Sequence, residues 1–386
     1  MAAKPQETLR PALFDEQAFA ALLNDVEQRR AEFKQQRHIS RDIIERFREL
    51  GLYRAFVPEQ FGGSAMEPMK LLEIIERTCA VDGSTGWVVS FAFATKYLAS
   101  LPAPTLAQIY AHTPDIIFAG AVYPSQSADV VDGGVRISGR WGFGSGCLAA
   151  DLLGVGISVP SGDTSGLPLM AVLPADQLEI VESWDTFGMS GTGSHELVAD
   201  DVFVPNDWIL VRGAPATINT PIYRYPTLAY SAQVLGGCGL GIARGALDYV
   251  IGIAGGAVSI TGGAPLGERA NVQTHIGECE AKWRAARSWF YEQTENVWSQ
   301  ILAGEQVTRE DNMALRLSSS HCARVGAEVT RACFEITGTL GIFNDNPLSY
   351  AVPDAMVVAQ HAFLAEGSFT NAGKVLLDHP RIPGYD

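Results

Sequence analysis

The chain has 386 residues, of which 47 % are hydrophobic and 18 % are charged, and this composition suits a folded protein and excludes a disordered or coiled-coil chain. Because single cores usually stop growing at ~250–300 residues, we expect two or three subdomains. The formal net charge of −15, without any block of lysine and arginine, argues against a surface for nucleic acid or anionic membrane.

No stretch has the pattern of a targeting or membrane-spanning segment. Residues 1–17 lack the apolar core of a signal peptide, and no run approaches the ~18–20 uninterrupted apolar residues of a membrane span. We therefore expect a cytoplasmic protein with no membrane partner. The six cysteines occur singly, without a Cys-x-x-Cys motif or a Cys/His cluster, so we expect reduced, mostly buried thiols and no metal.

The first third of the chain has helical patterns. Apolar residues recur at helical spacing from Phe14 to Phe56, with Ser40 as a candidate N-cap and Gly51 as a candidate stop. Two further helical stretches follow, PMKLLEIIERTCAVD and STGWVVSFAFATKYLASL, and the second is apolar on nearly every side, which implies burial. We assign residues 1–114 to an N-terminal helical domain.

Residues 115–213 change to short β-branched or alternating segments separated by Gly, Pro, Asp and Ser. These segments predict a central domain of antiparallel strands, a small barrel or sandwich. Residues 140–151, RWGFGSGCLAAD, place aromatic side chains and a hydroxyl on a glycine-rich backbone. In the later loop, FGMSGTGS, the backbone amides can hold a phosphate or a polar ring edge, with Thr192 and Ser194 as further donors; an ordinary Gly/Ser turn is the alternative.

Residues 214–386 return to helical periodicity and predict a C-terminal four-helix bundle with short connections. The expected helices span residues 228–253, 272–303, 309–337 and 354–377. The motif GGCGLGIARG, at 236–245, lacks the preceding strand of a dinucleotide-binding loop, so we assign its glycines to close helix packing. His361 lies on the last expected helix, where a single histidine is either a buried structural residue or a catalytic group.

Together these segments resemble the acyl-CoA dehydrogenase superfamily over nearly the whole chain. GRWGFGSGCLAAD resembles the flavin segment Gly-x-Lys-x-Trp-Ile-Thr of that family, and FGMSGTGSHELVADDVFVP resembles its Gly-Met-x-Gly-(Ser/Thr) segment. In the last helix, the dehydrogenase base is expected eight residues after Asp354, where this chain has Ala362. The preceding residue, His361, matches instead the flavin-dependent monooxygenase branch, which includes phenol, dibenzothiophene and indole-oxidising enzymes.

The resemblance implies an acyl-CoA dehydrogenase-like fold and a two-component monooxygenase. Reduced flavin, FADH2 or FMNH2, would come from a separate NAD(P)H flavin reductase, and dioxygen would oxygenate an aromatic or heteroaromatic substrate through a C4a-hydroperoxyflavin. The choice between FMN and FAD stays open, because Tyr350 and Pro353 stand where the branch often has arginine. Thr95 stands where phenol-hydroxylating members carry a histidine, which favours an indole-like substrate that needs no deprotonation.

The same resemblance assigns roles to individual residues. His361 and Ser145 are the expected catalytic residues, with Ser145 on flavin N5 and Phe143 against the flavin ring. The other expected residues are flavin contacts at Trp141, Thr192, Gly193 and Ser194, flavin contacts across the subunits of a homotetramer at Arg269 and Gln273, and substrate contacts at Trp87, Phe91, Thr95 and Tyr123.

Two other functions stay open at this point. The first is an acyl-CoA dehydrogenase or oxidase that uses Glu366 as its base, since Glu366 lies one helical turn beyond the usual position and residues i and i+4 share a helix face. The second is a flavin-free scaffold of the same fold.

Overall fold

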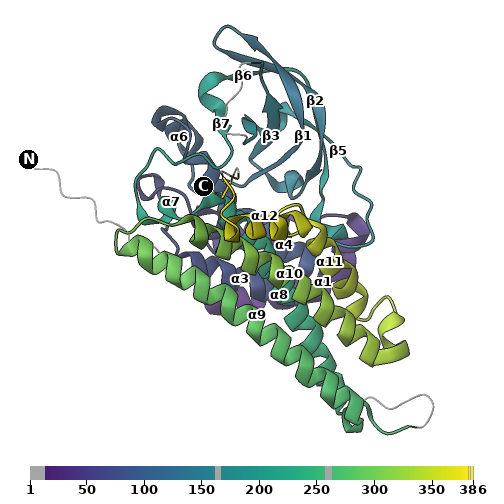
Figure 1. Cartoon of the computed structure of the whole chain (residues 1–386). Coiled ribbons are helices and arrows are strands. Elements are labelled where there is room, and N and C mark those ends of the chain that lie inside the picture. Colours follow the sequence, from purple (N-terminus) through teal and green to yellow (C-terminus); the bar gives the residue numbers. More distant parts are fainter. Residues whose placement is uncertain (1–13, 161–166, 257–262, 381, 383, 386) are drawn as a thin grey trace, which may run out of the picture.

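The computed structural model describes residues 14–160, 167–256, 263–380, 382, 384 and 385. In Figure 1 the strands form one end of the molecule and long helices form the other, with α4 and α12 where the two parts meet. The order of helices, strands and helices along the chain is therefore the one that the sequence predicts.

The N-terminal part consists of short and medium helices. They are α1 (Glu16–Gln36), α2 (Arg41–Glu49), α3 (Pro68–Val81), α4 (Gly83–Ser90), α5 (Thr95–Leu98) and α6 (Ala103–Ile109). The carboxylate of Asp15 caps α1 by accepting the backbone N–H groups of Gln17 and Ala18. All eight residues of α4 are buried, as predicted for the largely apolar stretch STGWVVSFAFATKYLASL.

Seven strands form one mixed sheet in the order β5-β6-β2-β1-β3-β4-β7. They are β1 (Phe118–Val131), β2 (Gly134–Gly144), β3 (Leu152–Ser158), β4 (Leu169–Pro174), β5 (Glu179–Val181), β6 (His195–Pro205) and β7 (Ile209–Val211). The prediction of wholly antiparallel strands is wrong at one pair, because β1 and β3 are parallel. The hairpin partner β2 lies on one side of β1, and β3 then returns along the other side in the direction of β1.

The C-terminal part begins with one short helix and continues as a bundle of longer helices. They are α7 (Pro221–Arg224), α8 (Thr227–Ala254), α9 (Ala270–Leu302), α10 (Arg309–Thr337), α11 (Leu348–Gln360) and α12 (Glu366–Leu376). A Cβ atom added to Gly241 in α8 would lie 2.2 Å from the Glu76 carbonyl of α3, so the glycines of this helix serve close packing, as predicted. In α10 a reciprocal capping box joins Thr308 and Asp311.

The expected last helix, 354–377, is two helices. α11 ends at Gln360, and His361 has an extended backbone (φ −61°, ψ 137°). The N–H of Phe363 donates to Nδ1 of His361, 3.2 Å away, so a side chain replaces the carbonyl that would continue the helical ladder. This turn takes His361 out of the regular helix and separates it from Glu366, the first residue of α12.

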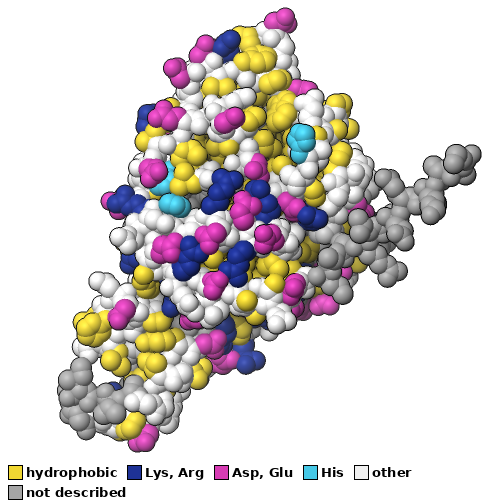
Figure 2. Space-filling view, turned by 180° about the vertical axis from the view of Figure 1, so that it is seen from behind, with side chains coloured by type: hydrophobic (Ala, Val, Ile, Leu, Met, Phe, Trp, Pro, Cys, Tyr) yellow, Lys and Arg dark blue, Asp and Glu magenta, His cyan; other side chains and the backbone are white. Residues whose placement is uncertain are grey.

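The surface and the thiols agree with the composition. Figure 2 shows acidic and basic side chains interspersed across the middle of one face, without a large patch of one sign. Among the described residues, only α8 is long and apolar enough to cross a membrane, and 72 % of its apolar window is buried inside the protein. All six cysteines are buried with free thiols, as predicted.

Candidate functional site

Four segments that are distant in sequence meet where the sheet joins the bundle, the region between α4 and α12 in Figure 1. α4 contributes Trp87, the end of β2 leads to Ser145, and the loop before β6 contributes Ser194. The turn after α11 contributes His361. We call this meeting place of the four segments the seam site.

A chain of hydroxyl groups forms the sheet side of the seam site. The indole N–H of Trp87 donates to Ser145 Oγ at 3.2 Å, and Ser145 Oγ lies 2.6 Å from Ser194 Oγ. Ser194 Oγ lies 2.7 Å from Thr192 Oγ1, which donates to the Met189 carbonyl at 2.8 Å. All of these hydroxyls are buried.

Counting hydrogens gives this chain a direction. Thr192 uses its one hydroxyl hydrogen on the carbonyl of Met189, so Ser194 must donate to Thr192, and Ser145 must donate to Ser194. Trp87 supplies the fourth donor. Ser145 Oγ therefore has no hydrogen left for a ligand, and it offers its remaining lone pair as an acceptor.

His361 lies on the bundle side of Trp87. Their ring centroids are 5.5 Å apart at an angle of 65°. Because Nδ1 accepts the Phe363 N–H, the neutral ring carries its hydrogen on Nε2. Burial, and secondarily the charge of Arg212, lower the pKa of His361 to about 4. His361 is therefore a neutral donor at pH 7.

Phe143 presents an open aromatic face at the end of β2. Its side chain is 73 % exposed and its φ is +65°, an unusual value for a bulky residue. The ring of Trp184 lies 6.0 Å from that of Phe143, and its indole N–H donates to the Met189 carbonyl at 3.0 Å. A side chain at Gly142 would meet nothing within 4 Å. An apolar ring face, open backbone and a nearby acceptor on Ser145 fit the edge and face of an isoalloxazine.

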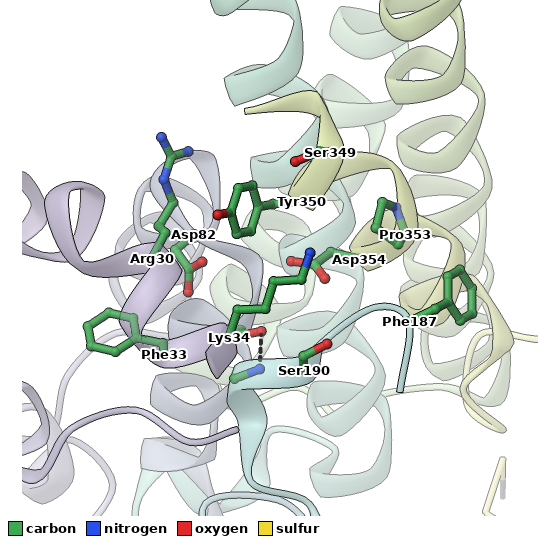
Figure 3. A pocket seen from close by; sticks show the side chains of 12 residues that line it. Arg30, Phe33, Lys34, Asp82, Phe187, Ser190, Ser349, Tyr350, Pro353 and Asp354 are labelled. Atoms are coloured by element: carbon green, nitrogen blue, oxygen red, sulfur yellow. Dashed lines mark hydrogen bonds between the residues drawn. The ribbon is translucent and has the colours of Figure 1, made fainter. Parts of the chain in front are cut away.

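A buried carboxylate holds the loop that carries these groups. The N–H of Met189 donates to Asp354 Oδ1 at 2.5 Å. Burial, and secondarily the negative charge of Asp82, raise the pKa of Asp354 to about 7. Figure 3 shows Lys34 of α1 extending toward Asp354 across a small pocket beside this loop. The pocket has a volume of about 10 Å³, room for roughly one water molecule, so it is too small for an aromatic substrate.

Four predicted residues make no hydrogen bond or ring contact with the groups of the seam site among the described residues. Trp141 is fully buried in the core of the sheet, where its indole N–H donates to the Gly156 carbonyl at 2.8 Å, so the expected flavin contact at Trp141 is wrong. Thr95 is buried and donates its hydroxyl to Ala92. Tyr123 is 61 % exposed on β1, and Phe91 is half-buried beyond the end of α4.

Two other expectations concern the bundle. Arg269 and Gln273 donate to the carbonyls of Ala264 and Gly267 near the start of α9. Figure 1 places this end of α9 far from the sheet, so the two residues do not join the seam site within one chain. Glu366 is exposed on the first turn of α12, and the usual base position, Ala362, lies in the turn between α11 and α12, so the two do not share a helix face.

The sequence analysis missed Trp184, Tyr97, Arg212 and Phe363. Trp184 has a recognisable signal, since it comes directly before the loop that resembles a flavin segment. Arg212 has none: it follows a three-residue strand and meets Tyr97 and Phe363 only through the fold.

The chain is similar to known proteins over its whole length. Residues 12–103 match the family acyl-CoA dehydrogenase, N-terminal domain, and residues 233–366 match acyl-CoA dehydrogenase, C-terminal domain. An indole-3-acetate monooxygenase of Pseudomonas putida is 47 % identical over 97 % of both chains. The oxygenase component of an FADH2-dependent resorcinol hydroxylase of Rhizobium sp. is 28 % identical over 84 % of both chains.

A solved structure has a similar fold. The crystal structure of a 3-HSA hydroxylase of Rhodococcus sp. RHA1 superimposes with a TM-score of 0.90 at 24 % identity, covering 97 % of this chain and 100 % of the other.

Proposed function

This chain belongs to the acyl-CoA dehydrogenase family, in its branch of flavin-dependent monooxygenases, and we propose that it oxygenates an indole that carries a carboxylate side chain. It is the oxygenase component of a system in which a separate reductase supplies the reduced flavin. Indole-3-acetate is the first candidate substrate, because a relative named for that compound is 47 % identical to the chain. The directed hydroxyl chain beside the open face of Phe143 is the observation that carries the proposed site.

Bound reduced flavin would activate dioxygen, so that one oxygen atom enters the substrate and the other leaves as water. In our proposal Ser145 accepts a hydrogen bond from N5–H, the hydrogen that distinguishes reduced from oxidised flavin. Thr192 and Ser194 fix the hydroxyl of Ser145 in the accepting orientation. Gly193, with a φ of +55°, makes the turn that places these two residues on one side of the loop.

Phe143 and Trp184 cover the flavin ring in this proposal. Both are aromatic, and their edge-to-face contact holds Phe143 in place beside the loop. Trp87 contacts the substrate and, through its indole N–H, also supports Ser145. The burial of Trp87, Ser145 and Ser194 excludes water from the place where oxygen is transferred.

In our proposal His361 would donate a hydrogen bond from Nε2 to the oxygen, derived from dioxygen, that reacts with the substrate. Because its pKa lies at about 4, it holds its proton at Nε2 and does not pick up a second one at neutral pH. Its role is therefore to stabilise developing negative charge on oxygen by a fixed donor.

Arg269 and Gln273 remain proposed flavin contacts only for an oligomer, in which a neighbouring subunit brings them to the flavin. A homotetramer would have four such sites, each receiving Arg269 and Gln273 from a neighbouring subunit. Sedimentation at a range of protein concentrations tests this arrangement, and a monomer that binds reduced flavin with full affinity would contradict it.

The function is tested with purified protein, a flavin reductase and either FMN or FAD. We expect consumption of indole-3-acetate and formation of an oxygenated product with at least one of the two flavins. Failure with both would contradict the proposal. A CoA thioester that bleaches the oxidised flavin of the protein under anaerobic conditions would instead favour a dehydrogenase.

A further inference from the structure

Two positive side chains meet on the bundle side of the seam site. The guanidinium carbon of Arg212, which follows β7, lies 4.8 Å from the ring centre of Phe363, and that of Arg316, on α10, lies 5.6 Å from the same centre. Arg212 also lies 5.4 Å from the ring of Tyr97, and Arg316 lies 3.9 Å from the ring of Tyr385. Aromatic faces therefore surround both cations.

Neither arginine has an acidic partner among the residues that the structure describes. Arg316 donates from Nη1 to the Gly384 carbonyl at 2.7 Å, but the Nε groups of both Arg212 and Arg316 are buried without a hydrogen-bond partner. By contrast Arg244, which also has a buried Nε group, pairs through its two other nitrogens with Asp248 and Glu280, both at 2.7 Å. Two like charges placed side by side without a counterion repel each other, and an anion bound beside them would relieve that repulsion.

The position of the pair relates it to the seam site. The ring of Phe363 lies 5.6 Å from that of His361, and the ring of His361 lies 5.5 Å from that of Trp87. Arg212 is close enough for its charge to lower the pKa of His361. An aromatic ligand near Trp87 and His361 would thus have a positive charge next to it, on the side of Phe363.

We propose that Arg212 binds the carboxylate of the substrate, an inference that rests on the proposed function. Arg212 is the better placed of the two arginines, because it is half-buried, whereas Arg316 is 7 % exposed and already donates to a carbonyl. A planar guanidinium accommodates a carboxylate through two parallel hydrogen bonds. Arg316 adds a second positive charge behind the first. The site thereby selects indoles with a short acidic side chain over neutral indoles.

The test compares indole-3-acetate with 3-methylindole, which has the ring but no carboxylate. In an Arg212→Gln variant we expect KM for indole-3-acetate to rise about 10- to 100-fold, the range for a lost charged hydrogen bond. We expect KM for 3-methylindole to stay within about twofold, since no charge is lost there. Arg212→Lys, which keeps the charge, should recover part of the loss.

Two controls separate this inference from its premise. Arg331→Gln removes an exposed arginine of α10 and should change neither KM. Calorimetric titration of the flavin-free protein with indole-3-acetate measures the carboxylate site without any reaction. Weaker binding in Arg212→Gln than in the wild type supports the inference even if no flavin condition yields product, an outcome that contradicts only the proposed function. Equal losses for both ligands, or no loss for either, would overturn the role of Arg212.

Discussion

The two sides of the seam site satisfy their polar groups in opposite ways. On the sheet side, Trp87, Ser145, Ser194 and Thr192 donate in series to one carbonyl, and every hydrogen has an acceptor. On the bundle side, Arg212 has a buried Nε that finds no hydrogen-bond acceptor in the described part of the chain. The sheet side therefore has all of its own hydrogen bonds in place before a ligand binds. On the bundle side, in our proposal, the guanidinium of Arg212 obtains its hydrogen-bond acceptor only when an anion binds.

The largest effect should come from His361, which stands between the two sides. His361→Ala removes the fixed Nε2–H donor and should lower the rate of product formation about 100-fold, as expected for loss of one such donor. His361→Gln, which retains an N–H donor, should lose less. Because the pKa of His361 is about 4, the ratio of wild-type to His361→Gln rates should stay constant from pH 6 to pH 8. A ratio that changes across that range would show that His361 titrates there.

The next effect should come from the acceptor on the sheet side. Ser145→Ala removes the oxygen that in our proposal would accept from flavin N5–H, and we expect the affinity for reduced flavin to fall about tenfold or more. Anaerobic fluorescence titration measures it. Ser158→Ala, at an exposed serine of β3, is the control and should have no effect. Unchanged affinity in Ser145→Ala would remove this residue from the flavin site.

A subtler change tests the direction of the hydroxyl chain. In Ser194→Ala the hydroxyl of Ser145 loses its acceptor and becomes free to donate to the unprotonated N5 of oxidised flavin. We expect the preference for reduced over oxidised flavin to shrink, by up to about tenfold, mainly through tighter binding of the oxidised form. If both forms weaken equally, the chain serves packing rather than selection.

The smallest effect concerns the support of the loop. The folded-state pKa of Asp354 is about 7, above its ordinary value of 3.8, so this carboxyl contributes stability that is lost as the pH rises from about 4 to 7. Asp354→Asn keeps the acceptor for Met189 and does not titrate. Relative to wild type, it should gain about 1 kcal/mol in unfolding free energy between pH 6 and pH 7. Denaturant unfolding at both pH values measures this difference, and an equal offset at both would contradict the assignment.

Sequence patterns predict much of the fold and the sheet side of the site. The resemblance of the glycine-rich segment to a flavin segment singles out Phe143 and Ser145 as candidates. Local periodicity places three of the four expected bundle helices within a few residues, and it misses the break between α11 and α12. It does not reveal that β3 pairs in parallel with β1, because alternation within a strand carries no information about its partner.

Trp141 and Phe143 show where a local pattern fails. Two residues apart on a strand, they should point to the same face. A register shift between Trp141 and Gly144 and the positive φ of Phe143 turn the second ring outward, while the first stays in the core. Similarly, the helix ends at His361 where the backbone N–H of Phe363 donates a hydrogen bond to Nδ1 of the His361 side chain. The arginine pair depends on tertiary contacts alone.

Oxygen transfer at the seam site is tested most directly by giving the protein indole-3-acetate, reduced flavin and ¹⁸O-labelled dioxygen. Mass spectrometry then determines the mass of the product. Monooxygenation at the seam site predicts a product that carries one labelled oxygen atom, formed by the wild type and strongly reduced in His361→Ala. A product without label, or no product with either reduced FMN or reduced FAD, would contradict it.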